Sequence, residues 1–255
     1  MSRLPFVALA LAAALVASCD PQPTDPNTSP VTSAAVTTAD FIRPDFDPHD
    51  FVRVVDNRFF PLRPGTRLVY KGEEDGEAET NVTLVTYHRK EILGISAVVV
   101  LDRVFVHGEL KEKTFDWYAQ DEDGNVWYLG EDTKEYEDGQ VVSTAGSWEA
   151  GVHGAKAGII MLAHPQVGDQ YRQEFLAGEA EDVARVVARG LDIRVPYGSF
   201  HNCLKTLDFT RLEPGIKEAK MYCPGVGFVK AKSIHGETGH LVLTGISHFS
   251  RLNKR

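Results

Sequence analysis

The chain has 255 residues, of which 43% are hydrophobic and 25% are charged, a composition that is ordinary for a globular protein. Its formal net charge is −9, and no basic stripe is visible. An acidic body repels the phosphate backbone, so the sequence excludes nucleic-acid binding. Beyond the N-terminus no apolar run approaches the length of about 20 residues that a transmembrane helix needs.

The N-terminus has the pattern of a secretory signal peptide. Arg3 gives a cationic start, and the apolar run over 4–16 is shorter than the stretch of about 20 residues that spans a bilayer. The run ends in "VASC", which resembles the lipobox of bacterial lipoproteins. The resemblance implies that Cys19 carries lipid and becomes the first residue of the mature protein. The alternative is an ordinary signal peptide with a free cysteine.

Residues 20–40 are rich in Pro, Thr, Ser and Asp and contain almost no large apolar side chain. Such a segment cannot bury enough surface to offset its ordering entropy, so we expect a disordered tether. A flexible chain of about 20 residues spans roughly 25 Å. We therefore expect three parts: a signal peptide (1–18), a lipidated tether (19–44) and one β-rich domain (45–255). This plan predicts a protein of the bacterial cell envelope, anchored to a membrane on its extracytoplasmic side.

Two cysteines remain in the body, Cys203 and Cys223. An even number of cysteines in an oxidising compartment predicts a disulfide. In the chain-entropy model a loop of this length contributes about 3 kcal/mol. The alternative is a zinc or copper site, in which His201 and Cys203 share one strand face and Cys223 is a third ligand.

The body shows many short strand signals and no long segment of helical period. Turn residues such as Asp123-Gly124 and Asp138-Gly139 recur every 8–12 positions, which is typical of an antiparallel meander. A long sheet with one apolar face and few covering helices must curl or pack on another sheet. We expect an all-β fold in which a curved sheet forms a barrel or half-barrel. The expected strands lie within 61–72, 80–89, 96–106, 112–120, 125–130, 170–178, 191–198, 203–212, 217–223, 226–234 and 240–249.

Two segments are ambiguous. Residues 179–190 place three valines at helical spacing, with acids first and a glycine last, but they also fit a strand, which we favour. Residues 144–164 are rich in Gly and Ala and show little alternation. We expect a long loop or lid there, with room for one short helix.

The stretch "DWYAQDEDGNVWYLGED" (116–132) has the densest group of aromatic and acidic residues. Asp-Gly between two aromatic strands predicts a hairpin, because glycine supplies the positive φ that tight turns need. A calcium loop is the alternative, since Asp121, Asp123 and Asn125 alternate as early EF-hand ligands do. The glycine, however, stands at position four instead of six, and the twelfth position holds Asp132 instead of glutamate. We therefore expect solvated turn acids and aromatic side chains that pack on the sheet.

A second function class is a secreted hydrolase that acts through a pair of carboxylates. Glycoside hydrolysis needs two carboxyl groups about 5 Å or about 6.5–9.5 Å apart. The candidates are Asp116, Glu174, Glu181 and Asp182. Acid density alone is weak evidence, because charge runs usually face water. The sequence lacks GxSxG, HExxH, P-loop and GxGxxG motifs, and no cofactor is expected.

We favour a non-enzymatic protein, tethered to the membrane, that binds an apolar or amphipathic ligand or an envelope protein. The reason is a long sheet with aromatic residues clustered in sequence. These candidate ligand-face residues are Trp117, Tyr118, Trp127, Tyr128 and Trp148.

Several stretches resemble an uncharacterised family of bacterial secreted lipoproteins. They include "DN..FPL.PGT" (56–66), the block that begins at Asp116, "VPYGSF" (195–200) and "LEPG" (212–215), followed by "Y.PGVGFVK" (222–230). This resemblance implies a compartment and a β-rich fold, and it implies no activity. At the level of fold the chain is also similar to LolA-like envelope half-barrels, which bind lipid or lipoprotein on a concave apolar face. Fold alone does not determine function.

Overall fold

The computed structural model describes residues 41–236 and 238–250. The expected signal peptide, the lipidation site at Cys19 and most of the expected tether lie outside these residues. Within the described residues a 3-10 turn, η2 (Pro48–Asp50), precedes the strands. The strands are β1 (Phe51–Val52), β2 (Thr66–Glu74), β3 (Glu77–Ile92), β4 (Ile95–Val106), β5 (Glu109–Asp121), β6 (Val126–Glu137), β7 (Gln140–Ser143), β8 (Trp148–Glu149), β9 (Lys156–Met161), β10 (Gln170–Arg172), β11 (Glu174–Phe175), β12 (Asp182–Val195), β13 (Gly198–Thr210), β14 (Lys217–Cys223), β15 (Gly227–His235) and β16 (Gly239–His248).

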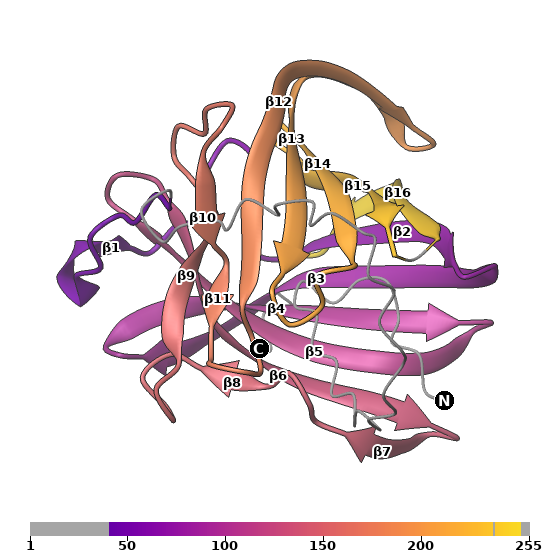
Figure 1. Ribbon diagram of the computed structural model, residues 1–255, viewed down its shortest axis with the longest axis horizontal. Helices are drawn as coiled ribbons and strands as arrows, with labels where there is room; N and C mark the ends of the chain where they lie inside the picture. Colours follow the sequence, from indigo (N-terminus) through magenta and orange to yellow (C-terminus); the bar gives the residue numbers. More distant parts are fainter. Residues whose placement is uncertain (1–40, 237, 251–255) are drawn as a thin grey trace, which may run out of the picture.

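The strands form one antiparallel sheet that curls into a nearly closed barrel (Figure 1). The wall contains thirteen strands, in the order β10-β12-β13-β14-β15-β16-β2-β3-β4-β5-β6-β9-β11. Neighbours in the chain are mostly neighbours in the sheet, and β16 pairs with β2 to join the two halves. The predicted all-β antiparallel meander with a barrel-like sheet is confirmed. The described residues contain no helix long and apolar enough to cross a membrane.

One short segment brings the two edges of the sheet together. β10 pairs with β12, and β11 pairs with β9 at the opposite edge. Gln173 lies between β10 and β11, and its backbone N–H donates to the carbonyl of Asp182 at 2.8 Å. β9 approaches this segment so closely that a Cβ on Gly158 would lie 2.4 Å from the Gln173 carbonyl carbon. Only glycine permits this contact, which holds the barrel nearly closed.

The two ambiguous segments have different outcomes. The favoured strand over 179–190 is confirmed, because β12 begins at Asp182 and runs through it. The expected loop or lid over 144–164 is wrong in part, since it contains β8 and β9 and no helix. The sequence of β9 does not alternate between polar and apolar residues, because both faces of the strand are covered over its last four residues. This is why the segment did not look like a strand.

Turn chemistry determines where the long hairpins reverse. Asp138 and Gly139 join β6 to β7 with φ values of 50° and 74°. Two consecutive residues with positive φ match the strand twist of a tight hairpin, and Asp-Gly is a preferred pair there. The Asp-Gly signal in the sequence therefore located this turn correctly.

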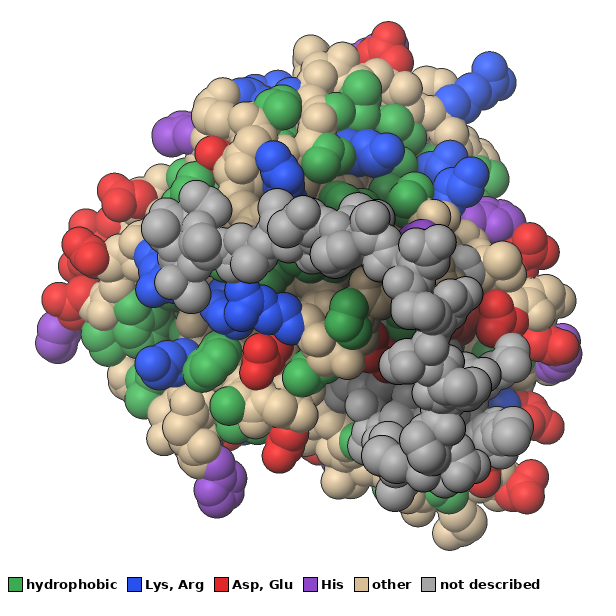
Figure 2. Space-filling view, viewed as in Figure 1, with side chains coloured by type: hydrophobic (Ala, Val, Ile, Leu, Met, Phe, Trp, Pro, Cys, Tyr) green, Lys and Arg blue, Asp and Glu red, His purple; other side chains and the backbone are tan. Residues whose placement is uncertain are grey.

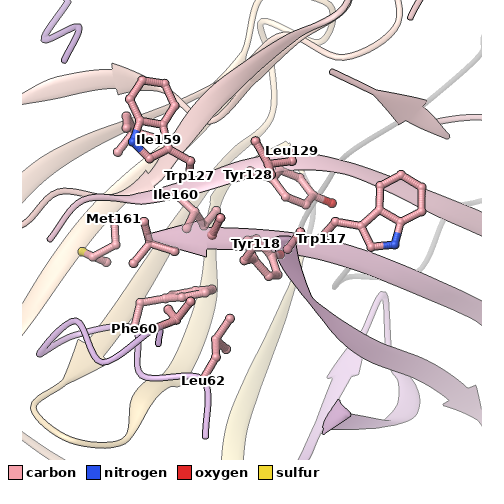
Figure 3. Packing of buried hydrophobic residues seen from close by; sticks show 14 of the residues in the cluster. Phe60, Leu62, Trp117, Tyr118, Trp127, Tyr128, Leu129, Ile159, Ile160 and Met161 are labelled. Carbon is pink, nitrogen blue, oxygen red and sulfur yellow. The ribbon is translucent and has the colours of Figure 1, made fainter. Parts of the chain in front are cut away.

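Hydrophobic side chains form two clusters inside and against the barrel. In the first, the rings of Tyr118 and Tyr128 stack with centroids 4.8 Å apart. Phe60, from the segment before β2, packs edge-on against Tyr118 at 5.2 Å (Figure 3). The segment before β2 is thereby part of the core.

Cys203 of β13 and Cys223 of β14 form the predicted disulfide, with Cα atoms 4.3 Å apart. Cys203 precedes Leu204 and Cys223 follows Tyr222, and Leu204 and Tyr222 are directly paired, so the bridge joins neighbouring strands. Both cysteines are fully buried. Disulfides persist outside the reducing cytoplasm, so this bond agrees with an extracytoplasmic location.

Replacing both Cys203 and Cys223 with alanine should lower the free energy of unfolding by about 2–5 kcal/mol, because the unfolded chain regains the entropy that the cross-link removes. Urea denaturation of the oxidised protein and of the double variant measures this difference. A thiol titration of the denatured, unreduced protein should find neither of these two sulfur atoms reactive. If it finds both, the bridge does not form.

Candidate functional site

The barrel interior carries an unusual number of acids. Ten carboxylic side chains are buried among the described residues, against one lysine and no arginine. They come from strands around most of the barrel and are Glu79, Asp102, Glu112, Asp116, Asp121, Glu131, Glu174, Asp182, Asp208 and Glu218. On β5, burial alternates so that Glu112, Thr114 and Asp116 face inward. The opposite face carries Lys113, whose ammonium lies 4.8 Å from the Phe115 ring centre.

Sheet register places several of these acids side by side. Asp116 of β5 lies directly opposite Glu131 of β6, and Glu112 lies opposite Glu135. Like charges at directly opposed positions destabilise a sheet when both are ionised. Burial raises the pKa of Asp102 to about 6, that of Asp116 to about 7 and that of Glu112 to about 8. Protons held by Asp116 and Glu112 therefore reduce the repulsion near neutral pH.

A second acidic group lies toward β11 and β12. Burial, followed by the neighbouring Asp182, raises the pKa of Glu174 well above its ordinary value. Burial and the charge of Glu174 do the same to the pKa of Glu131. The Trp148 indole N–H donates to Glu174 Oε2 at 3.0 Å, and Thr133 donates to Glu131 Oε2 at 3.0 Å. Neither Glu131 Oε1 nor Glu174 Oε1 has a partner among the described residues.

Lys220 of β14 is the only lysine or arginine that is buried among the described residues. Its ammonium lies 3.2 Å from Asp208 Oδ2 and 3.3 Å from Glu218 Oε2. Burial opposes its charge, but Asp208 and Glu218 outweigh burial and raise the pKa of Lys220. This lysine therefore compensates the acids on β13 and β14, and the described acids on β4 to β6 have no buried lysine or arginine beside them.

A cavity of about 60 Å³ lies between the inner wall of β2 to β5 and the segment before β2. Most of its wall is apolar or aromatic, and two carboxylates reach into it. The lining residues that matter below are Phe60, Tyr70, Asp102, Asp116, Tyr118 and Phe228.

A larger groove of about 350 Å³ lies on the outside of the barrel, where the described chain begins. Its floor is the surface of β9 and β11, and its walls are aromatic side chains and two cations. The residues that matter are Phe41, Phe46, Trp127, Phe175, Lys156 and Arg172. The Phe46 and Trp127 rings pack at 5.0 Å, and the Trp127 N–H donates to Asp121 Oδ2 at 2.8 Å. We call this surface the aromatic groove.

Cations gather at the aromatic groove although the protein as a whole is acidic. The Arg172 guanidinium lies 5.3 Å from the Phe41 ring centre and 5.0 Å from that of Phe175. The Lys156 ammonium lies 5.8 Å from the Phe175 ring centre. Figure 2 shows Lys and Arg side chains together with hydrophobic ones on this side of the molecule, over β9 to β11. Arg172 Nη1 has no hydrogen-bond partner among the described residues.

Burial lowers the pKa of Arg172; Glu181 opposes this shift, and the nearby Arg211 and Arg43 add to it. Arg211 and Arg43 are therefore close enough to Arg172 to disfavour its charge. An anion at Arg172 would favour that charge and supply the acceptor that Arg172 Nη1 lacks within the described residues.

The structure places the five candidate ligand-face aromatics on different surfaces, and Figure 3 labels four of them: Trp117, Tyr118, Trp127 and Tyr128. Trp127 alone lies in the aromatic groove. Tyr118 and Tyr128 point into the barrel, and the Tyr128 hydroxyl donates to Asp116 Oδ1 at 2.7 Å. Trp117 lies on the outer face of β5, with the Lys90 ammonium 3.3 Å from its ring centre. Trp148 is buried against Glu174, so alternation along the strands separates residues that are adjacent in sequence.

Three of the four candidate hydrolase acids are buried inside the barrel: Asp116, Glu174 and Asp182. Glu174 and Asp182 are neighbours, whereas Asp116 lies at the small cavity. Glu181 is partly exposed and accepts a hydrogen bond from the Gly178 N–H at 3.0 Å. The structure therefore does not bring the four acids together as one group.

The candidate metal ligands are also dispersed. His201 is exposed, and its Nδ1 lies 2.8 Å from Asp192 Oδ1, while both sulfur atoms are joined in the disulfide. Within residues 41–236 and 238–250, no three His, Cys, Asp or Glu side chains are grouped as a metal site.

The loop over 121–125 is a tight turn, as predicted. Glu122 and Asp123 are exposed, but Asp121 is buried, contrary to our expectation of solvated turn acids. Its carboxylate accepts the backbone N–H of Asn125 at 2.7 Å and the side-chain amide of Asn125 at 2.9 Å. Asp121 therefore stabilises the turn through its two hydrogen bonds with Asn125.

Sequence reasoning missed most of the aromatic groove. Phe41 lies in the expected tether, although the neighbouring Ile42 N–H donates to the Gln170 carbonyl at 2.7 Å. The signal was two phenylalanines, Phe41 and Phe46, after a segment almost free of large apolar residues. Arg172 and Phe175 stood in a predicted strand, and nothing in their spacing indicated a site.

No family model matches the sequence, and no curated protein shows significant similarity to it. Two solved structures are distantly similar. One is a "putative exported protein with YmcC-like fold" from Bacteroides fragilis, with 15% identity and a TM-score of 0.44, covering 75% of this chain and 99% of that chain. The other is a "putative lipoprotein" from Parabacteroides distasonis, with 13% identity and a TM-score of 0.40, covering 75% of this chain and 99% of that chain.

Proposed function

We propose that this protein is a non-enzymatic binding lipoprotein of the bacterial cell envelope, anchored through Cys19, whose aromatic groove takes an anionic amphiphile. The supporting observation is the combination of aromatic walls with the Arg172 guanidinium, one of whose nitrogens lacks a partner in the described chain. Apolar walls favour the hydrocarbon part of a ligand, and the guanidinium favours a phosphate or carboxylate head group.

The position of the aromatic groove supports a ligand that comes from a membrane. The described chain begins at Phe41, which lines the groove, and the proposed anchor at Cys19 stands 22 residues before it in the sequence (41 − 19). A flexible tether of about 20 residues spans roughly 25 Å, so the groove would stay within reach of the lipid surface. The anionic head groups of that surface match the cations of the groove, although the whole chain is acidic.

Arg172→Gln should weaken the binding of dodecyl phosphate at least tenfold, because the charge-assisted contact to the head group is lost. The full chain carrying Cys19→Ala is used, so that no lipid anchor and no detergent are present. Isothermal titration with dodecyl phosphate below its micelle concentration measures the dissociation constant.

Three controls make this test specific. Arg185→Gln alters an exposed arginine on β12 outside the groove lining and should leave affinity unchanged. Dodecyltrimethylammonium, which has the same chain and the opposite charge, should bind more weakly than dodecyl phosphate. Inorganic phosphate should bind more weakly still, because it cannot use the aromatic walls. Equal binding of both amphiphiles, or equal loss in both arginine variants, would overturn the proposal.

A further inference from the structure

We propose that the small cavity inside the barrel binds the ammonium group of a small organic amine. This site is separate from the aromatic groove, and the inference does not depend on the proposed function. It rests on three features of the cavity: aromatic rings in its lining, two carboxylates, and one buried hydroxyl group that makes no hydrogen bond of normal geometry within the described residues.

Aromatic rings bound the cavity on two sides. Phe60 and Tyr118 form one wall, with ring centroids 5.2 Å apart, and Tyr70 and Phe228 form another, with centroids 5.1 Å apart. The face of an aromatic ring attracts a cation, and cages of such rings recognise organic ammonium groups. An inorganic cation would demand a complete set of oxygen ligands, which these walls do not supply.

The two carboxylates supply the counter-charge. Asp102 accepts hydrogen bonds from the Asn81 amide at 2.6 Å and from Thr83 at 3.0 Å, which hold its position. Asp116 accepts one from the Tyr128 hydroxyl at 2.7 Å. Each carboxylate can accept about four hydrogen bonds, so both retain capacity for an N–H donor in the cavity.

Tyr118 provides the independent indication of a ligand. Its side chain is 1% exposed and lines the cavity, and its hydroxyl group makes no hydrogen bond of normal geometry within the described residues, although it lies near enough to Asp116 to lower the pKa of that carboxyl group. Figure 3 shows the ring between Tyr128 and the Phe60 side chain, so packing holds it in place. A buried hydroxyl without a partner costs about 1–3 kcal/mol, and an N–H donor from a ligand would remove that cost.

The surrounding charges favour a cation. Burial raises the pKa of Asp102 and Asp116, and the charge of Asp102 raises the pKa of Asp116 further, whereas the charge of Arg103 lowers the pKa of Asp102. A bound ammonium would favour the ionised carboxylates and so release protons. Lys220 pairs with Asp208 and Glu218 on β13 and β14 and does not line this cavity.

The volume limits the ligand to a compact group. A cavity of about 60 Å³ has room for roughly two water molecules at their liquid volume of about 30 Å³ each. Methylammonium fits that volume, whereas tetraethylammonium does not. We therefore expect a small primary ammonium group and discrimination against bulky quaternary ones.

Methylammonium chloride is the probe, and saturation-transfer NMR on its methyl protons measures binding to the full chain at pH 8. The expected result is saturable binding that exceeds that of methanol, a neutral molecule of similar size, at least tenfold. Asp102→Asn should weaken it at least tenfold, and Tyr118→Phe, which keeps the ring, should weaken it several-fold. Asp192→Asn, on an exposed residue, should leave it unchanged.

Sodium chloride at equal ionic strength should not displace the probe, and tetraethylammonium should not compete. The proposal is overturned if methanol binds as well as methylammonium, if sodium displaces the amine, or if Asp102→Asn and Tyr118→Phe both bind like the parent protein. Because Tyr118→Phe removes one oxygen atom and retains packing, it tests the site even if Asp102→Asn fails to fold.

Discussion

Replacing Lys220 with methionine should lower the free energy of unfolding by about 3–5 kcal/mol at neutral pH, the cost of removing one partner from a buried ion pair. Lys220 lies 3.2 Å from Asp208 and 3.3 Å from Glu218, and both acids are buried. Methionine fills a volume similar to that of lysine, so the loss of stability would come from the missing charge and not from a cavity. Thermal unfolding followed by circular dichroism measures it.

Lys217→Met on the same strand is the matched control. Lys217 is exposed, so its replacement should change stability by no more than about 0.5 kcal/mol. Adding Asp208→Asn to Lys220→Met should restore part of the loss, because one uncompensated carboxylate is removed. A cost below about 1 kcal/mol for Lys220→Met would show that the acids on β13 and β14 do not need this lysine.

The fold was predictable because its signals are local. Asp-Gly turns such as Asp138-Gly139 and β-branched strands predict an antiparallel meander without knowledge of long-range contacts. The closure of the barrel was not predictable. It depends on the segment from Gln170 to Phe175, which pairs with β12 and with β9, and on the close approach at Gly158. Neither contact can be predicted from the local sequence pattern.

The candidate sites were less predictable than the fold for a related reason. Alternation on β5 separates Asp116 and Tyr118 from Phe115 and Trp117. Both faces of this strand are largely covered, so polarity alone does not show which face points inward. Here the acids of β5 point inward and are stabilised by protons and by neighbouring hydroxyl groups.

Stability should fall as pH rises from about 4.5 to about 8, because folding raises the pKa of Glu112 from 4.5 to about 8. The folded protein binds this proton more tightly than the unfolded chain does. The stability that this proton contributes is fully present below the pKa of Glu112 in the unfolded chain, and it is lost as the pH rises through the pKa of Glu112 in the folded protein. Asp102, Asp116 and Glu135 surround Glu112 and oppose its ionisation. For one such group the loss is about 1.4 kcal/mol per pH unit, or about 3–5 °C in Tm.

Glu112→Gln should therefore raise stability at pH 8 by about 2–4 kcal/mol and leave it nearly unchanged at pH 4.5, because glutamine resembles the protonated acid. Thermal unfolding of both proteins across this range measures the difference, and the curve of the variant should be flatter. Glu109→Gln, on the same strand but exposed, should not flatten it. Parallel curves for Glu112→Gln and the parent protein would mean that Glu112 is ionised inside the barrel at neutral pH. The acidic interior would then require a bound cation instead of protons.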